Sequence, residues 1–342
     1  MPKTRQEAGA DLGPEWASEF VPLPGVRGAH LQTVIPHYLP RRNTLPPSEG
    51  RRFRVASDVH VLCQCNWQPR REQALTLVLV HGLEGSSEAQ YMIGTANKAW
   101  DAGMNVVRMN VRSCGGTEAL SPTLYHSGMS GDVGEVVHAL IAEEHLQRIA
   151  LAGFSMGGNQ VLKLAGEWGR DHSTPPQIEG VVGISPAMDL AASSSALHEA
   201  WNRVYEWWFL WSLRQTLRRK VRLFPSRYKV TRWWWRSVKD FDDCVTAPHN
   251  NFSDAADYYR QASASRVMEH IAVPTLIIHS KDDPMVRITP ETRKKLVANP
   301  CIRLVETEHG GHCGFLAAAN GYDGRWAERM IVAFLSGTCG ER

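Results

Sequence analysis

Residues 148–159, which read R-I-A-L-A-G-F-S-M-G-G-N, constrain the fold of this chain more than any other stretch. Residues 149–152 are apolar, as in a buried parallel strand, and residues 159–168 carry apolar side chains at helical spacing. Between them lies a G-x-S-x-G pentapeptide, residues 153–157. A strand, a tight turn with Ser155 at its apex and a helix are the context of a nucleophile elbow; the simpler alternative is a glycine-rich turn with a capping serine. We predict that Ser155 is exposed on a strained turn behind which helix N–H groups are free.

The remaining pattern predicts an α/β fold with a mostly parallel central sheet covered by helices on both faces. Two strand patterns around Ser57-Asp58 predict an antiparallel pair. Later apolar runs alternate with helical patterns, and these runs are residues 75–80, 105–110, 149–152, 180–184, 275–279 and 302–305.

We divide the chain into three parts. Residues 1–52 are rich in Pro, Gly and Arg without a sustained period, which predicts a loosely structured N-terminal arm. Residues 53–186 and 251–342 are assigned to the core. Residues 187–250 have helical stretches and tryptophan clusters but no strand pattern, so we predict a helical cap inserted over the carboxyl edge of the sheet, where ligands of such folds bind.

Composition limits the classes of function. The 342 residues are 43% hydrophobic and 21% charged, as in a globular protein with a large core, and a formal charge of +3 is too small to imply nucleic acid. No stretch could span a bilayer, the N-terminus has no signal-peptide pattern, and the 7 cysteines are scattered. We expect a cytoplasmic protein with reduced thiols. Motifs for metal or nucleotide sites are absent from the sequence, so we expect no metal and no cofactor.

A serine nucleophile needs a base, and the base needs an orienting acid. Asp282 and Asp283 follow the strand pattern at 275–279, and we prefer Asp283 because the chain turns away directly after it. Asp189 is a weaker candidate because it lies where the cap begins. After the last strand, His312 follows two glycines that let the backbone approach the elbow, so we prefer it to His309.

A second glycine-rich loop, residues 81–87 (H-G-L-E-G-S-S), follows the apolar run at 75–80. Such a loop can direct a backbone amide at a developing oxyanion, so we predict the amides of Leu83 and Met156 as its donors. His81 and Gly82 are predicted to lie at the substrate, with His81 supporting the loop rather than accepting protons.

The cap is basic and aromatic between residues 203 and 239, where Glu206 is the one acidic residue. One interpretation is peripheral contact with an anionic membrane surface, in which tryptophans insert among cations. In the other, Trp207, Trp208 and Trp211 bind substrate over Ser155 and the cations form a solvated face. Both interpretations favour an apolar acyl chain. The cations are Arg203, Arg214, Arg218, Arg219, Lys220, Arg222, Arg227, Lys229, Arg232, Arg236 and Lys239.

These motifs together resemble the YheT-like family of α/β-hydrolases from about residue 25 to 335. The resemblance is carried by H-L-Q-T at 30–33, N-V-R-S-C-G-G at 110–116, F-D-D-C-V-T-A-P at 241–248, D-Y-Y-R-Q-A-S at 257–263, K-D-D-P at 281–284 and G-G-H-C-G-F at 310–315, besides the two loops above. It implies an α/β-hydrolase fold and a serine esterase or lipase acting on carboxylic esters of acyl lipids.

The resemblance further implies the triad Ser155, Asp283 and His312. Two features depart from the family: Ser57-Asp58-Val59 replaces its usual Asp-Gly turn, and the N-terminal membrane anchor of eukaryotic relatives is absent from the sequence. Acyl transfer on the same triad and a non-catalytic binding protein remain alternatives. The sequence does not determine the oligomeric state.

Overall fold

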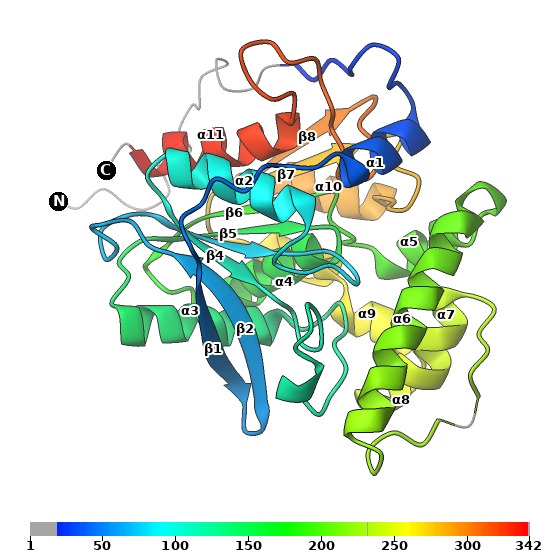
Figure 1. The fold of residues 1–342 in the computed structure, drawn as a ribbon. Helices are drawn as coiled ribbons and strands as arrows, with labels where there is room; N and C mark the ends of the chain where they lie inside the picture. Colours follow the sequence, from blue (N-terminus) through cyan, green and yellow to red (C-terminus); the bar gives the residue numbers. More distant parts are fainter. Residues whose placement is uncertain (1–18, 231, 341–342) are drawn as a thin grey trace.

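The computed structural model describes residues 19–230 and 232–340. Eight strands form one sheet in the order β1-β2-β4-β3-β5-β6-β7-β8 (Figure 1). β1 and β2 are antiparallel, β2 is antiparallel to β4, and every other pair is parallel, which confirms the predicted class. The strands are β1 (Glu49–Ala56), β2 (Val59–Asn66), β3 (Thr76–Val80), β4 (Asn105–Met109), β5 (Ile149–Phe154), β6 (Ile178–Ile184), β7 (Thr275–Ser280) and β8 (Ile302–Thr307).

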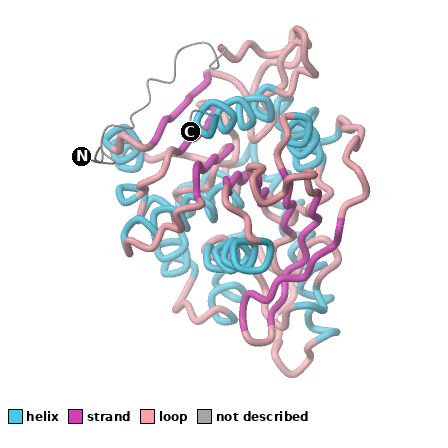
Figure 2. The backbone as a smooth tube through the Cα atoms, turned by 90° about the vertical axis from the view of Figure 1, so that its left-hand side faces the viewer, coloured by secondary structure: helices cyan, strands magenta, loops and turns pink. Residues whose placement is uncertain are grey.

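Helices cover both faces of this sheet, as Figures 1 and 2 show from two directions. α2 (Gln90–Asp101) and α11 (Trp326–Gly340) lie together on one face. α3 (Ser130–Glu144) and α4 (Met156–Arg170) lie on the other, and α10 (Pro290–Ala298) packs beside β8. The sheet is therefore buried on both sides, which is why its strands read as continuous apolar runs in the sequence.

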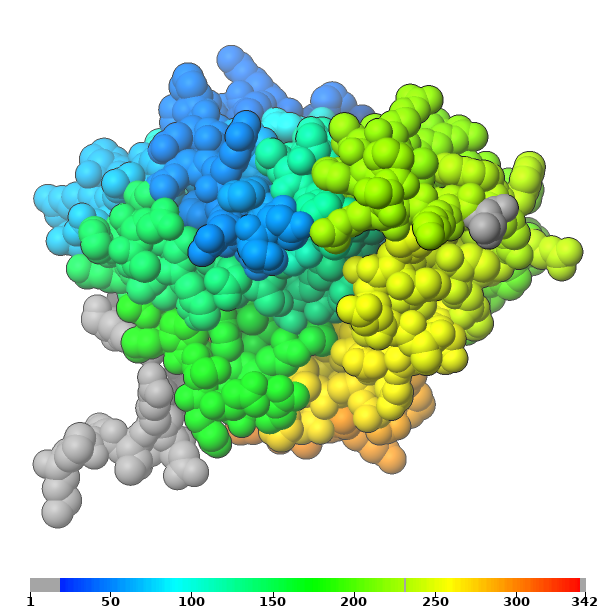
Figure 3. Space-filling view, turned by 90° about the horizontal axis from the view of Figure 1, so that it is seen from below, coloured from blue at the N-terminus to red at the C-terminus, as the bar shows by residue number. Residues whose placement is uncertain are grey.

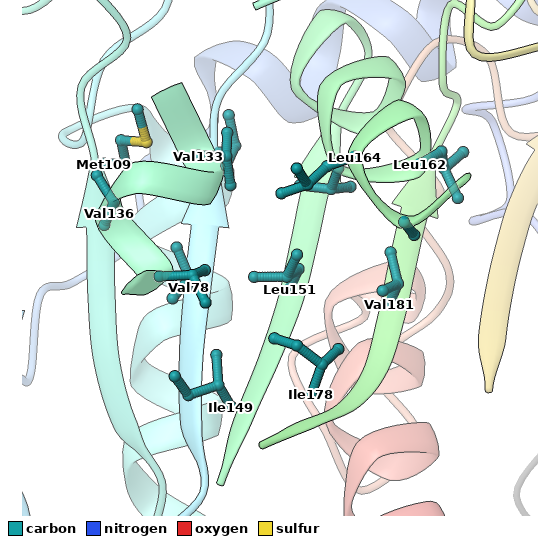
Figure 4. Close-up of a cluster of buried hydrophobic side chains, with 14 of the residues drawn as sticks. Val78, Met109, Val133, Val136, Ile149, Leu151, Leu162, Leu164, Ile178 and Val181 are labelled. Carbon is teal, nitrogen blue, oxygen red and sulfur yellow. The ribbon is translucent and has the colours of Figure 1, made fainter. Parts of the chain in front are cut away.

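The alternation of side chains along β3 shows how the two core layers arise. Leu77 and Leu79 pack in the layer that contains α2 and α11, whereas Val78 and Val80 pack in the layer beneath α3 and α4. Figure 4 shows the second layer, in which Leu151 of β5 meets Leu164 of α4. The carboxyl ends of β5, β7 and β8 are fixed by this packing, and the loops that leave them are held at one edge of the sheet.

The N-terminal region is more ordered than the sequence predicted. Residues 1–18 of the proposed arm lie outside the described residues. The remainder contains α1 (Ala29–Tyr38), a helix not predicted from the sequence, and β1 begins at Glu49 rather than after residue 52. The sequence shows no clear helical periodicity here, because α1 is one short helix with Pro36 inside it. A helix of this length is stabilised mainly by tertiary contacts.

The segment between β6 and β7 is helical, and no strand occurs among its described residues. We keep the name cap for residues 187–250. Its helices form their own small apolar core, which includes Leu210, Leu217 and Trp235. The elements between β6 and β7, of which the last three follow the cap, are α5 (Leu190–Leu197), η3 (Ala200–Asn202), α6 (Arg203–Leu223), α7 (Val238–Phe241), η4 (Asp242–Thr246), α8 (Ala247–His249), α9 (Ala255–Ala262), η5 (Ala264–Arg266) and η6 (Met268–His270).

The cap also contacts the core on the side of the β1–β2 hairpin. Figure 3 shows the two segments side by side, and an ion pair of 3.2 Å joins Arg227 of the cap to Asp58 of the hairpin turn. On the core side, the short helix η2 (Glu118–Leu120) packs against α6. The cap is therefore attached to the core at several points along its length.

Lys220 corrects the prediction that the basic residues of the cap form one surface. Its side chain is buried, and its ammonium donates to the carbonyl oxygens of Glu118 and Ser121. Burial lowers the pKa of Lys220 to about 8. The neighbouring Arg219 pairs with the Glu118 carboxylate at 2.6 Å. Lys220 thus anchors α6 to the core, whereas Arg218 and Arg222 point into solvent.

Candidate active site

Ser155 lies between β5 and α4 with φ 54° and ψ −115°, a conformation that non-glycine residues rarely adopt. The two glycines of the pentapeptide make this turn possible. A Cβ on Gly153 would lie 2.2 Å from the carbonyl oxygen of Gly157, and a Cβ on Gly157 would lie 2.3 Å from the carbonyl oxygen of Val80. The predicted strained turn is therefore present, and no larger residue fits at either flanking position.

His312 lies on the loop after β8 and reaches both of its predicted neighbours. Its Nε2 is 2.8 Å from Ser155 Oγ, and its Nδ1 is 2.8 Å from Asp283 Oδ2. A carboxylate can only accept, so Nδ1–H donates to Asp283 and leaves Nε2 to accept from the serine hydroxyl. This is the geometry needed for a base that removes the serine proton.

The two adjacent aspartates have different partners. Asp283 is 1% exposed, and its Oδ1 accepts hydrogen bonds from the backbone amides of Met285 at 2.8 Å and Val286 at 2.9 Å. Asp282 instead accepts from the Gly311 amide at 2.9 Å and lies 3.3 Å from His309 Nδ1. Thus Asp283 orients the ring of His312, while Asp282 holds the loop that carries it.

The third acidic candidate lies away from this chain of contacts. Asp189 accepts from the backbone amide of Thr289 at 3.0 Å and from the hydroxyl of Thr292 at 2.8 Å. It therefore fixes the start of α10 to the beginning of the cap. This is the structural role that remains when an aspartate has no histidine partner.

Charge coupling sets the protonation of His312 and Asp283. Burial alone would lower the pKa of His312, but the Asp283 carboxylate outweighs it and holds this pKa well above the ordinary value of 6.5. For Asp283, burial would raise the pKa, but the charge and the hydrogen bond of His312 lower it below its ordinary value. The pair therefore favours an ionised aspartate beside a basic imidazole.

The loop at 81–87 lies directly beneath Ser155. A Cβ on Gly82 would lie 3.2 Å from Ser155 Cβ, and the Gly82 amide donates to the hydroxyl of Tyr91 at 3.0 Å. Leu83 and Met156 line the same pocket as Ser155. Met156 is the first residue of α4, where a backbone N–H has no acceptor within the helix.

His81 is fully buried beneath this loop rather than in the pocket. Its ring bonds the carbonyl oxygen of Gly82 at 2.7 Å and accepts from the Val111 amide at 3.1 Å. Burial lowers the pKa of His81 to about 4, so the ring is neutral. The expectation that it supports the loop agrees with these contacts, but its placement at the substrate does not, because neither His81 nor Gly82 lines the pocket.

Glu84, in the same loop, joins the core to the cap, although the local sequence pattern did not indicate this role. Its carboxyl group accepts from the hydroxyl of Tyr125 at 2.6 Å and from two hydroxyls of α6, those of Ser212 at 2.5 Å and Thr216 at 2.8 Å. Its backbone has φ 55°. The cap helix and the loop beneath Ser155 are therefore held together by one side chain.

α1 supports the loop of His312, again through residues not assigned a role from the sequence. The Thr33 hydroxyl accepts from the backbone amide of His312 at 2.9 Å. The Gln32 side chain bonds both the amide and the carbonyl of Leu316, at 2.8 and 3.0 Å. A Cβ on Gly314 would lie 1.7 Å from the carbonyl oxygen of Gln32. The only signal for this role was the H-L-Q-T segment at 30–33.

The tryptophans predicted to bind substrate lie outside the pocket. Trp207, Trp208 and Trp211 are 63%, 43% and 58% exposed on the outer side of α6. From this helix, Phe209 and Leu213 line the pocket instead. The prediction of a helix here is confirmed. The sequence could not show which face of α6 turns toward Ser155, because both faces carry aromatic or aliphatic residues.

The described residues contain no group of three or more His, Cys, Asp or Glu side chains arranged to hold a metal ion. None of the helices in the described ranges combines the length and the apolar character that crossing a bilayer requires.

An eight-stranded, mostly parallel sheet with a serine elbow after β5 defines the class of α/β-hydrolases, and the family described as alpha/beta hydrolase fold matches residues 76–319. Within this class the chain belongs to the YheT-like family. It is 31% identical over 325 residues to YheT of Escherichia coli, assigned as an esterase, and the match covers 94% of each chain.

More distant similarities agree with this placement. The chain is 26% identical over 272 residues to the monoacylglycerol lipase of Saccharomyces cerevisiae, and the match covers 76% of this chain and 58% of the yeast protein. The Pyrococcus furiosus esterase Pf2001 superposes with a TM-score of 0.57 at 16% identity, over 87% of this chain and 98% of that one. At this identity the structural likeness shows the fold alone.

Proposed function

We propose that this protein is a serine esterase that cleaves carboxylic esters of acyl lipids through an acyl-enzyme. The observation that carries the proposal is the continuous chain from Asp283 through His312 to Ser155, with two contacts of 2.8 Å. The relatives named as an esterase and a monoacylglycerol lipase support the same reaction class. The fold by itself would not, since one fold hosts many activities.

The chemistry follows from the contacts. Ser155 Oγ attacks the ester carbonyl carbon while His312 Nε2 takes its proton, and the carbonyl oxygen becomes an oxyanion that accepts from the amides of Leu83 and Met156. When the tetrahedral intermediate collapses, the C–O bond breaks and His312 returns the proton to the departing alkoxide. Water then enters and attacks the acyl carbonyl carbon while His312 takes a proton from it, and when the bond to Ser155 Oγ breaks, His312 returns that proton to Oγ and the acyl group leaves as a carboxylic acid. Asp283 stabilises the imidazolium that forms in each half of the cycle.

The substrate preference is argued from the pocket. Apart from the catalytic groups, much of its lining is apolar and comes from both the core and the cap. Leu83 and Met285 are contributed by core loops, and Leu197, Phe209 and Leu213 by cap helices. Such a lining binds a hydrocarbon chain and excludes water from the ester bond.

Labelling with a fluorophosphonate tests the nucleophile, with Ser155→Ala as the control. We expect the wild type to be labelled and to hydrolyse p-nitrophenyl esters of graded acyl length, whereas the variant does neither. Analysis of products with an added alcohol separates hydrolysis from acyl transfer. Absence of labelling in a folded wild type would favour a non-catalytic binding protein and contradict the proposal.

We further propose that the cap contacts anionic membrane surfaces peripherally. α6 exposes Trp207 and Trp211 in its first half and Arg218 and Arg222 in its second half. The first half lies beside α1, since His30 Nδ1 is 2.9 Å from the Tyr205 hydroxyl, and α1 also exposes apolar side chains. Exposed tryptophans next to cations suit the head-group region of a bilayer.

A further inference from the structure

One wall of the pocket beside Ser155 brings together an aspartate and several hydroxyl groups. Its residues come from α5, η4 and α9, and α9 contacts both of the other elements. η4 is a single π-helical turn, a rare conformation that often occurs at functional sites. The residues of this wall that the argument uses are Ser193 and Ser194 of α5, Asp242 and Thr246 of η4, and Tyr259 of α9; Tyr258 of α9 also lines the pocket, and its hydroxyl accepts from the Ser127 amide at 2.9 Å.

Asp242 is the charged group of the wall. It is 8% exposed, and it accepts one hydrogen bond on each oxygen, from the Thr246 hydroxyl at 2.6 Å and from the Tyr259 hydroxyl at 2.7 Å. Burial raises the pKa of Asp242 to about 6 in spite of these two bonds. A carboxylate has about four acceptor positions, so two side-chain donors leave it able to take another donor.

Its neighbour Asp243 shows what a purely structural aspartate does in the same turn. Asp243 accepts from the backbone amide of Ala255 at 2.7 Å and pairs with Lys239 at 2.7 Å. It does not line the pocket. The two aspartates therefore divide the roles: Asp243 holds α9 to the cap, and Asp242 faces the pocket.

The hydroxyls of the wall are oriented by Asp242. The Tyr259 hydroxyl donates its one proton to the carboxylate, so it must accept the proton of Ser194, whose Oγ is 3.0 Å away. Ser193 is different. Its side chain is 8% exposed and lines the pocket, and its Oγ has no hydrogen-bond partner among the described residues. A buried hydroxyl without a partner is costly, unless a ligand supplies the missing bond.

We propose that this wall is a subsite for a hydroxyl group carried by the ester substrate, an inference that rests on the proposed esterase function. A hydroxyl group both donates and accepts, so it matches a carboxylate that can accept a further bond and a serine hydroxyl that has a proton to donate. An ammonium group would satisfy only Asp242, because it cannot accept a hydrogen bond. The subsite would favour partly acylated polyols, or hydroxylated acyl chains, over fully apolar esters.

Three esters with the same scissile bond distinguish the source of the hydroxyl: ethyl butanoate, 2,3-dihydroxypropyl butanoate and ethyl 4-hydroxybutanoate. The measured quantity is kcat/KM for each hydroxylated ester relative to ethyl butanoate. We expect the wild type to prefer one hydroxylated ester, and Ser193→Ala to reduce that preference about two- to tenfold, the range of one neutral hydrogen bond. The preferred ester shows whether the hydroxyl lies on the alcohol or the acyl side.

Stability provides a second readout. Because Ser193 Oγ has no partner in the described residues, Ser193→Ala should not lower the Tm, whereas loss of a structural hydroxyl would. Ser195→Ala is the matched control, since Ser195 lies on the same helix, is exposed and bonds only the backbone carbonyl of Ala191. This control should change neither the preference nor the activity.

The outcomes separate this proposal from the proposed function. If the wild type hydrolyses none of the three esters, the esterase assignment fails. If it hydrolyses them with the same relative kcat/KM in the wild type and in Ser193→Ala, the subsite alone is refuted. The proposal would also be overturned if the wild type preferred butanoylcholine, and if Asp242→Asn removed this preference while Ser193→Ala left it intact. The subsite would then bind a cation and not a hydroxyl group.

Discussion

The core and the cap contribute to the pocket in different ways. The core supplies Ser155, Asp283 and His312, each on a loop that leaves the carboxyl end of a parallel strand and is held by backbone hydrogen bonds. The cap supplies much of the remaining lining, and side-chain contacts such as those of Glu84 attach it to the loops beneath Ser155. We infer that the reacting groups are fixed by the sheet, while the fit to the substrate depends on how the cap is seated.

The largest effect expected from this comparison is confined to the core. Ser155→Ala should lower kcat for a soluble ester by about 10⁴- to 10⁶-fold, because no other group can form the acyl-enzyme. Circular dichroism should show an unchanged fold, since alanine removes only an oxygen. Turnover above about one per cent of wild type in a preparation free of other esterases would refute the role of Ser155.

A comparison of Asp282 and Asp283 tests which aspartate of the core orients His312. Asp283→Asn should reduce kcat by about 10⁴-fold, because an amide at this position no longer holds His312 in the reactive tautomer. Asp282→Asn should cost much less, since its carboxylate bonds the Gly311 amide and not His312. Steady-state kinetics of the two purified variants provide the comparison. Equal or reversed losses would transfer the acid role to Asp282.

The pH profile tests the coupling of His312 to Asp283. Only neutral imidazole can accept the serine proton, so kcat/KM should fall as the pH falls through the pKa of His312. Because Asp283 raises this pKa, the acidic limb of the wild type should lie above 6.5, and in Asp283→Asn it should move to lower pH. His309→Gln is the control. If the acidic limb moved in that variant, it would reflect the titration of His309 and not that of His312.

The seating of the cap should have a smaller but measurable effect. In Glu84→Ala, the hydroxyls of Tyr125, Ser212 and Thr216 lose the carboxylate that accepts from all three. We expect kcat/KM to fall about tenfold. A double-mutant cycle with Ser212→Ala measures the link between cap and loop. Strict additivity of the two changes would mean that α6 and the loop act independently.

The smallest effect concerns the outer surface of the cap. Replacing Trp207 and Trp211 with Ala should weaken sedimentation with anionic vesicles about fivefold, with little change in hydrolysis of a soluble short-chain ester. Val297→Ala, at another exposed apolar side chain, is the control. If the wild type stays in the supernatant at low salt, the membrane proposal is wrong. Lys220 is unsuited to such a test because it is buried.

The sequence alone determined the sheet, the elbow and the position of the candidate residues. Apolar runs of strand length alternate with helical patterns, and residues that follow parallel strands meet at one edge of the sheet, so Ser155, Asp283 and His312 could be expected to converge. The glycines of the elbow were equally readable, because Gly153 and Gly157 lie where any Cβ would collide with backbone. These features depend on local pattern and on strand order.

The tertiary structure decided what local pattern cannot express. Periodicity shows that a helix has an apolar face, but not which neighbour covers it, so Phe209 rather than Trp207 reached the pocket. Glu84, Thr33 and Lys220 acquire their roles from partners between 41 and 279 residues away in the chain. Such contacts form only when distant elements pack together. A side chain exchanges its hydrogen bond to water for one within the protein only if packing brings the partner within about 3 Å.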